Sequence, residues 1–261
     1  LVNGNLIFAH ADTAMNGNRL PVSITHYYNS CDSDKDEFGM GYGWRTSLHQ
    51  TLHKVLYNGE VEFVYTDGDG TEHFFKKNDS DQKKYSDQSG LSLTLEIGDE
   101  NITITDKGDN VMTFPLMSDT PTEDAPETAK VLIQKIRDAV GNEITVTALA
   151  DSPLKIASVT DGANRVTTLH YTDGRCDRIQ TPWQDAKNCV RFKYENGALV
   201  KIRHEDNRAS EYVYNEEIGY HLLKTAYDAD GASVEYAYTN TDRMSSLPYR
   251  NLHIFGVKWL F

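Results

Sequence analysis

The chain has 261 residues, of which 39% are apolar and 25% charged, and its formal net charge is −13. This length is enough for one large β domain or two smaller ones with a buried core. The negative charge argues against binding to DNA or RNA backbones, whose phosphates it would repel. Because the sequence has no run of about 18 apolar residues, it also predicts no membrane-spanning helix.

Tyrosine is the outlier of the composition, with 15 residues against 9 phenylalanines and 3 tryptophans. A tyrosine ring packs on a pleated sheet while its hydroxyl reaches a polar partner, which favours a β-rich fold. The three cysteines predict no disulfide framework. Cys176 and Cys189 fall on neighbouring predicted strands, but a turn near Gln184 would set Cys189 opposite Ile179 or Gln180, which disfavours a bridge between the two.

The first half of the chain predicts a series of antiparallel hairpins. Alternating apolar and polar stretches bounded by Gly, Asn and Asp are frequent, and helical periodicity is scarce. Asp67–Gly70 combines turn-forming residues between two such stretches. We therefore expect residues 1–117 to form an N-terminal β segment. Its predicted strands are residues 20–28, 61–65, 72–75, 91–97, 102–105 and 111–114.

Residues 118–130 interrupt this pattern. The segment is acidic, contains two prolines and has no apolar periodicity, which predicts a linker or an exposed loop. We place the expected domain boundary there.

Residues 131–240 repeat a unit of about 22 residues. A turn-forming aspartate recurs at Asp138, Asp161, Asp185, Asp206 and Asp228. From the second unit on, the strand behind it ends in a tyrosine, at Tyr171, Tyr194, Tyr214 and Tyr238. A second turn follows, with Gly174 and Gly197 in two of the units. Each unit is thus one hairpin, and because single hairpins are marginal in water, we expect the units to join into a continuous curved antiparallel sheet.

These units resemble the tyrosine–aspartate (YD) repeats of the Rhs family, whose relatives include the shells of Tc toxin complexes and the teneurins. The likeness lies in Tyr-x-Asp/Asn-Gly at residues 171–174 and 194–197, and in Asp-x-x-Gly at 138–141 and 228–231. The fourth unit departs from the pattern, because no glycine follows Tyr214 closely.

The first part of the chain resembles the segment that opens Rhs repeat regions in many bacterial proteins. The matching stretches are residues 2–8, 20–30 and 38–44. Together the two likenesses cover about residues 1–117 and 131–240.

The resemblance implies a structural module without a catalytic site or a cofactor. Such a module would contribute to a spiralling β shell in a large exported bacterial protein, secreted or at the cell surface. The shell would enclose or display a C-terminal toxin or effector. The partners would be the rest of the shell and its cargo.

Two other functions compete with this interpretation. A glycan- or cell-wall-binding module would use exposed tyrosines and tryptophans, with Trp44 and Trp183 as candidates, since aromatic rings stack on sugars. A glycoside hydrolase would need two carboxylates about 5 to 10 Å apart in a cleft. The sequence has many carboxylates but no motif that selects a pair.

Two short motifs near the N-terminus have simple structural interpretations. Asp32, Asp34 and Asp36 alternate as calcium ligands do, but the residues expected at the sixth and twelfth positions of an EF-hand loop are exchanged, so a solvated loop is favoured over weak calcium binding. The glycines of Gly39–Gly43 lack the partners of a phosphate loop, and we expect a close backbone approach beside Trp44.

The two ends of the chain carry further expectations. The sequence opens without Met or a basic-then-apolar leader, so we expect a fragment or a processed piece of a longer protein. The tail, residues 241–261, predicts a truncated or capping strand. An open sheet edge there would favour self-association of the chain.

Overall fold

The computed structural model describes residues 5–14, 19–215, 221–240 and 252–260. Within these ranges the chain is built from β-strands and one short 3-10 helix, Ser30–Asp32. No helix in the described part is long and apolar enough to cross a membrane. The strands are β1 (Ile7–Ala14), β2 (Ser23–Asn29), β3 (Trp44–Thr46), β4 (Thr51–Tyr57), β5 (Glu60–Thr66), β6 (Glu72–Asn78), β7 (Asp81–Asp87), β8 (Thr94–Ile97), β9 (Asn101–Thr105), β10 (Val111–Pro115), β11 (Val131–Leu132), β12 (Lys135–Arg137), β13 (Glu143–Leu149), β14 (Ser152–Thr160), β15 (Val166–Thr172), β16 (Arg175–Gln180), β17 (Val190–Glu195), β18 (Ala198–Arg203), β19 (Ala209–Asn215), β20 (Leu222–Tyr227), β21 (Ser233–Asn240) and β22 (Leu252–Leu260).

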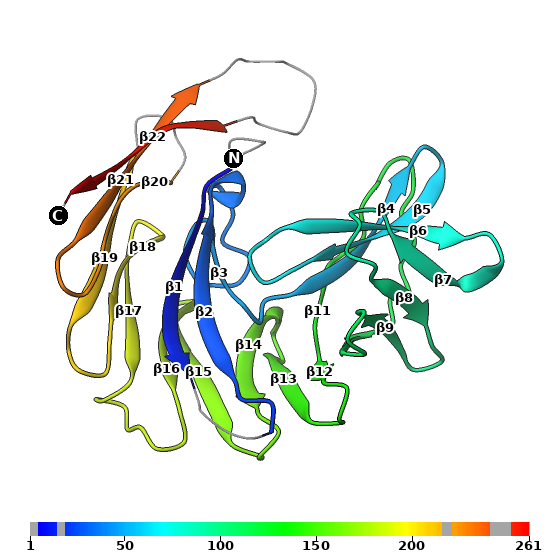
Figure 1. Ribbon diagram of the computed structural model, residues 1–261, viewed down its shortest axis with the longest axis horizontal. Helices are drawn as coiled ribbons and strands as arrows, with labels where there is room; N and C mark the ends of the chain where they lie inside the picture. Colours follow the sequence, from blue (N-terminus) through cyan, green and yellow to red (C-terminus); the bar gives the residue numbers. More distant parts are fainter. Residues whose placement is uncertain (1–4, 15–18, 216–220, 241–251, 261) are drawn as a thin grey trace. The chain divides into compact units, whose positions relative to one another are not determined.

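The predicted all-β fold, a curved sheet of sequential antiparallel hairpins, is confirmed. Nearly every strand from β4 onward pairs antiparallel with the next strand of the chain (Figure 1). The exception is the short strand β11, which pairs with β4, so that β10 pairs directly with β12. This local pairing order follows from the short turns, which leave consecutive strands as neighbours.

The contacts divide the chain into two compact units, and these do not follow the expected boundary at 118–130. One unit comprises residues 1–13, 25–46 and 169–261, and the other residues 14–24 and 47–168. The acidic segment runs along β4 instead of linking domains, because Leu56 N donates to the carbonyl of Pro126 and Thr128 N donates to that of Lys54. The Lys54 ammonium also donates to the carbonyl of Asp119 in this segment and to that of Met117, directly before it. A proline-rich, acidic segment held by backbone bonds therefore belongs to the second unit.

The second unit contains β4 to β14 and the start of β15. Its core is formed by the inward residues of the alternating strands, as period-2 patterns require. The largest buried side chains include those of Leu52, Phe63, Phe75, Leu95 and Phe114.

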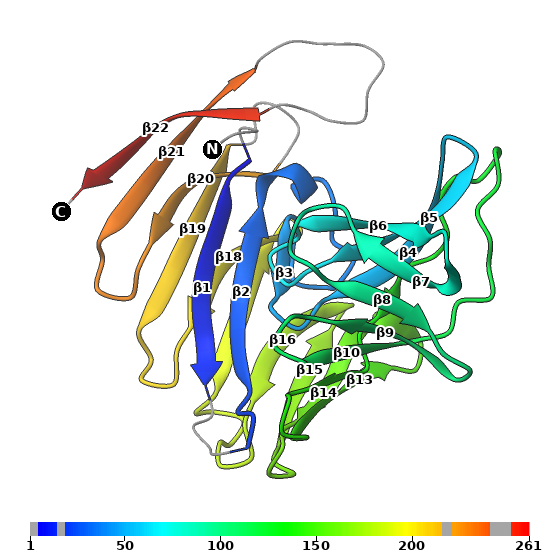
Figure 2. The ribbon, with the colours of Figure 1, turned by 45° about the vertical axis from the view of Figure 1, so that its right-hand side comes forward.

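The first unit combines two sheets. One is three-stranded, in the order β1-β2-β3, and the other holds the hairpins from β16 onward. In both Figure 1 and Figure 2, β1 and β2 (blue) lie against the hairpins β16–β19. Tyr28, Trp44, Leu199 and Tyr212 are buried between the two sheets of this unit.

The tail contributes a strand. Strand β22 pairs antiparallel with β21, with Ser233 opposite Leu260 and Asn240 opposite Leu252. The remainder of the predicted tail, residues 241–251 and 261, lies outside the described residues, as do residues 1–4 of the expected N-terminal segment.

Candidate functional site: the tyrosine ladder and the Asp12 cluster

The turns of the repeat region share one geometry. At Asp138, Asp161 and Asp228, the backbone N–H of the aspartate donates to the carbonyl four residues on, and the N–H three residues on donates back. The aspartate carboxylate accepts from the N–H groups two and four residues on, for example those of Val140 and Asn142 at Asp138. An aspartate at this position thus satisfies turn donors, which explains its recurrence.

Asp185 and Asp206 stand elsewhere in their turns. The residue that directly follows the strand, in the place of Asp138, is Thr181 in the third unit and His204 in the fourth. His204 keeps the backbone pattern with Arg208. Asp185 lies four residues further on in a longer turn and Asp206 two residues further on, each capping local N–H groups.

The repeat tyrosines form a ladder, which we define as Tyr194, Tyr214 and Tyr238. Each hydroxyl donates to a backbone carbonyl on the return strand of the preceding hairpin. The acceptors are Cys176 O at 2.8 Å, Leu199 O at 2.5 Å and Leu223 O at 2.8 Å, in that order. Every acceptor is the second residue of its strand, β16, β18 or β20. The tyrosine of one repeat therefore binds the backbone of the repeat before it.

A β-bulge accompanies each step of the ladder. The register shifts directly before Tyr194, Tyr214 and Tyr238. Tyr194 then pairs with Leu199, whose carbonyl accepts the hydroxyl of Tyr214. A bulge interrupts the backbone hydrogen bonds between two paired strands, so a carbonyl beside it needs another donor. The hydroxyl of the next repeat tyrosine supplies that donor.

The three ladder tyrosines are half-buried side chains whose hydroxyls are bonded inside the protein. Burial raises the pKa of Tyr194, Tyr214 and Tyr238 above its usual range. Tyr214 also accepts a hydrogen bond of 2.7 Å from the indole N–H of Trp44, which connects the ladder to β3. Hydroxyls engaged in this way hold neighbouring strands together.

The remaining repeat residues lie where hairpins require them. Tyr171 is on β15, and Gly174 follows in the turn to β16 with φ of +79°. Gly197 has φ of +85°, and a Cβ there would collide with the ring of Tyr42. Cys176 and Cys189 are free thiols, as the sequence favoured.

The glycine loop 39–43 makes the predicted close approach. A Cβ on Gly41 would lie 2.9 Å from the backbone nitrogen of Leu199, and one on Gly43 would lie 2.7 Å from the ring of Tyr28. Both glycines have positive φ, of +91° and +78°. The loop therefore fits tightly beside Trp44, which is 2% exposed.

Two of the three carboxylates suggested for weak calcium binding, Asp32 and Asp36, have cationic partners from the protein, and Asp34 is exposed. Asp32 binds Arg45 at 2.9 Å and Lys35 at 3.1 Å. Asp36 binds the guanidinium of Arg175 and accepts from the backbone N–H of Gly41, both at 3.0 Å. Among the described residues, no group of three or more His, Cys, Asp or Glu side chains is arranged to hold a metal ion.

A second polar cluster, which we call the Asp12 cluster, lies between the two sheets of the first unit. It consists of His10 and Asp12 of β1, His26 of β2, Ser210 of β19 and His204 of the turn before β19. The buried Asp12 carboxylate binds His10 Nδ1 at 3.0 Å through one oxygen and His26 Nδ1 through the other. His10 Nε2 and His204 Nε2 each lie 3.2 Å from Ser210 Oγ.

The acceptor-only carboxylate fixes the proton positions in this cluster. Ionised Asp12 requires His10 to donate from Nδ1, so neutral His10 offers Nε2 as an acceptor. Ser210 then donates its hydroxyl proton to His10 and accepts from the Nε2–H of His204. Although burial opposes it, the charges and hydrogen bonds of His26 and His10 lower the pKa of Asp12.

Asp12, His10 and Ser210 follow the order of a catalytic triad, but the surroundings differ from a nucleophile's. Ser210 is 3% exposed, and its hydroxyl is already shared by two imidazoles beneath β1. A nucleophile needs room for substrate and donors for the oxyanion that forms. The arrangement suits the docking of β1 on β19. Sequence reasoning missed it, although His10 and Asp12, two apart on a strand, share one face.

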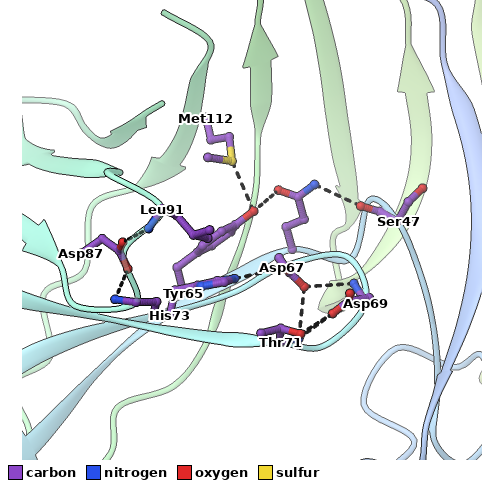
Figure 3. A network of polar contacts seen from close by, with 11 residues as sticks. Ser47, Tyr65, Asp67, Asp69, Thr71, His73, Asp87, Leu91 and Met112 are labelled. Carbon is purple, nitrogen blue, oxygen red and sulfur yellow. Dashed lines mark hydrogen bonds and ion pairs between the residues drawn. The ribbon is translucent and has the colours of Figure 1, made fainter. Parts of the chain in front are cut away.

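The second unit holds a further polar network at the Asp67–Gly70 turn (Figure 3). His73 donates to Asp67 at 3.0 Å, and Asp67 accepts the N–H groups of Asp69 and Thr71 at 3.1 Å. The hydrogen bond from its ring to Asp67 raises the pKa of His73. The predicted hairpin turn is confirmed between β5 and β6. The carboxylate of Asp67 stabilises this turn by accepting its backbone N–H groups.

The chain is similar to known proteins in sequence over its first part and in structure. Residues 1–75 match a family described as "Domain of unknown function (DUF6531)". The comparison with curated proteins gives no match. The chain is similar in structure to the N-terminal domain of effector protein SpvB from Salmonella typhimurium strain LT2, with 11% identity over 97% of this chain and 98% of that one, at a TM-score of 0.46. A TM-score of this size is too low to carry a functional argument.

Proposed function

We propose that this chain is a structural module of a large exported bacterial protein of the Rhs type, and not an enzyme. The observation that supports the proposal is the tyrosine ladder. Tyr194, Tyr214 and Tyr238 each bind the backbone of the preceding hairpin, so the most regular feature of the sequence serves to join repeats. A repeat that binds its predecessor in this way can be extended unit by unit into a shell.

The proposal includes the setting of the module. The rest of the shell and a C-terminal toxin or effector are its partners, and it is secreted or lies at the cell surface. The resemblance to Rhs opening segments and repeats supports this setting, and the match of residues 1–75 is compatible with it.

The parent reading frame tests the proposal. We expect the genomic frame around this sequence to continue with further repeats and a toxin domain, beside an immunity gene. In the purified parent protein, the toxin region should resist protease, and replacement of Tyr194, Tyr214 and Tyr238 by Phe should remove that resistance. A frame without repeats beyond this sequence, or a cargo equally accessible in both proteins, would overturn the proposal.

A glycan-binding module is the second candidate, and one observation favours it. Trp183 is 59% exposed, as a ring that stacks on a sugar must be, whereas Trp44 is buried and the ladder hydroxyls are engaged. A glycan array with the whole chain and its Trp183→Ala variant tests this candidate. Binding that depends on Trp183 would support it, and signals at background for the unaltered chain would exclude it.

A further inference from the structure

The fourth repeat breaks the pattern of the others at the Asp12 cluster. Its turn begins with His204 where three other turns have a capping aspartate. Six residues on, Ser210 pairs with Ile202 across the hairpin, and the residues in the same register of other repeats are apolar or β-branched. These equivalents are Ile144, Thr167, Val190 and Val234.

The two exceptional residues face each other and face β1. His204 Nε2 and His10 Nε2 both contact the single oxygen of Ser210 at 3.2 Å, and the two imidazole rings are 5.1 Å apart. Where a few residues depart from an otherwise regular repeat pattern, a functional role beyond the stability of the sheet is expected.

The hydrogen bonds of Ser210 depend on the number of protons held by the two imidazoles. A hydroxyl donates once, so it can bridge the histidines only while one Nε2 remains an acceptor. If His10 and His204 are both protonated, each is a donor aimed at the same oxygen, and the hydroxyl proton loses its acceptor. Two cations then lie about 5 Å apart, where burial weakens screening.

The neighbouring charges compensate only part of this change. Asp12 is the buried anion of the cluster, and its second oxygen is already bound by His26. On the solvent side, Asp206 attracts a charged His204 while Arg208 repels it. The other titratable groups that face the cluster are Tyr212 of β19, Tyr194 of β17 and Cys176 of β16, each with its pKa raised by burial and hence neutral.

We propose that the Asp12 cluster is an acid-released latch that holds β1 on the β18–β19 hairpin at neutral pH and lets it go on acidification. The inference concerns a contact within the first unit and does not require the shell function. The bond between Asp12 and His26 joins β1 to β2 and is not affected. When His10 and His204 are both protonated, the contact that is lost is the one through Ser210, between β1 and β19.

The direction of the pH dependence follows from His204. Its burial, followed by the positive charge of His10, lowers its pKa in the folded chain. The unfolded or released state therefore binds the proton more readily, and the stability of the contact falls as pH drops below about 6.5, the ordinary value for histidine.

Hydrogen exchange of the full chain at pH 7.5 and 5.0, corrected for intrinsic rates, tests the latch. We expect the protection of the β1 amides, Ile7–Ala14, to fall at pH 5.0 by about tenfold, because the released state binds the proton more readily. The amides of β20, Leu222–Tyr227, should keep their protection. Equal β1 protection at both pH values, or equal loss in β20, would overturn the proposal.

Matched variants separate the latch from general acid sensitivity. His204→Asn removes the titrating ring and installs a side chain common in such turns, so its β1 protection should change by less than about twofold between the two pH values, as for a site without a titrating group. His170→Asn removes a histidine of β15 that lies near Arg178 of β16, outside the cluster. This variant should leave the acid response of β1 intact. An unchanged response in His204→Asn, or its loss in His170→Asn, would contradict the proposal.

Discussion

The hydroxyl of Tyr214 donates a hydrogen bond of 2.5 Å to the carbonyl oxygen of Leu199, in the preceding hairpin of the sheet. Tyr194 makes the same bond to Cys176, one repeat earlier. The ladder therefore ties each hairpin to its predecessor by a side chain as well as by strand pairing, and it can be tested by removing the ring or only the hydroxyl.

Tyr194→Ala should lower the free energy of unfolding by about 2 to 4 kcal/mol, as the loss of a large packed aromatic does. Tyr194→Phe keeps the ring but leaves the carbonyl of Cys176 without its donor, which should cost about 1 to 2 kcal/mol. Urea denaturation measures both. Tyr227→Ala, at an exposed tyrosine on β20, is the control and should change stability by less than about 0.5 kcal/mol. Equal effects at Tyr194 and Tyr227 would mean that the ladder tyrosine is not structural.

Gly197→Ala should destabilise the chain more than Gly231→Ala. Both glycines have positive φ, +85° and +90°, so each substitution carries a backbone cost of about 1 to 2 kcal/mol. At Gly197 the new Cβ would also collide with the ring of Tyr42, which adds about 1 to 3 kcal/mol, whereas nothing lies within 4 Å at Gly231. The difference between the two variants in thermal or urea unfolding isolates the collision. Equal losses would show that Tyr42 moves away freely.

The sequence predicted the local structure well because hairpins are local. Turn chemistry at Asp138, Asp161 and Asp228 and the period of the tyrosines depend on residues close in the chain. The two offset aspartates have a simple cause. Asp185 and Asp206 are the nearest aspartates to turns whose first position is occupied by another residue, and a period alone cannot distinguish such neighbours.

The packing of the N-terminal strands could not be predicted in the same way. His10 and Ser210 are 200 residues apart in sequence and meet only because β1 docks on β19. Periodicity shows which residues of a strand share a face, but not which face of another sheet they meet. The boundary expected at 118–130 rested on composition alone. Composition does not show that the segment bonds to the backbone of β4, and these bonds hold it in the second unit.

Asp161→Asn should destabilise the chain at pH 7, by about 1 kcal/mol, and the difference should vanish in acid. Burial opposes the ionisation of Asp161, but hydrogen bonds from Arg165 outweigh it and lower its pKa. A carboxyl with a lowered folded pKa contributes stability above its unfolded value of about 3.9 and loses it as pH falls through the folded value. Urea unfolding of the unaltered chain and the variant from pH 7 to 2.5 measures how the difference between their free energies of unfolding shrinks. Asp99→Asn, at an exposed carboxylate, is the control. If this difference in free energy stayed constant in acid, the charge of Asp161 would not be the source of its stabilising effect.

Self-association through the C-terminal region remains a prediction. Strand β22 pairs with β21 along one edge, and a strand has two edges, so the other can accept a strand from a second copy. The net charge of −13 opposes the approach of two copies. Salt at about 0.15 M shortens this repulsion to roughly 8 Å, while strand pairing acts at contact. Size-exclusion chromatography with light scattering should therefore show a larger mass as protein and salt concentrations rise. A strict monomer in both low and high salt would show that the edge is capped.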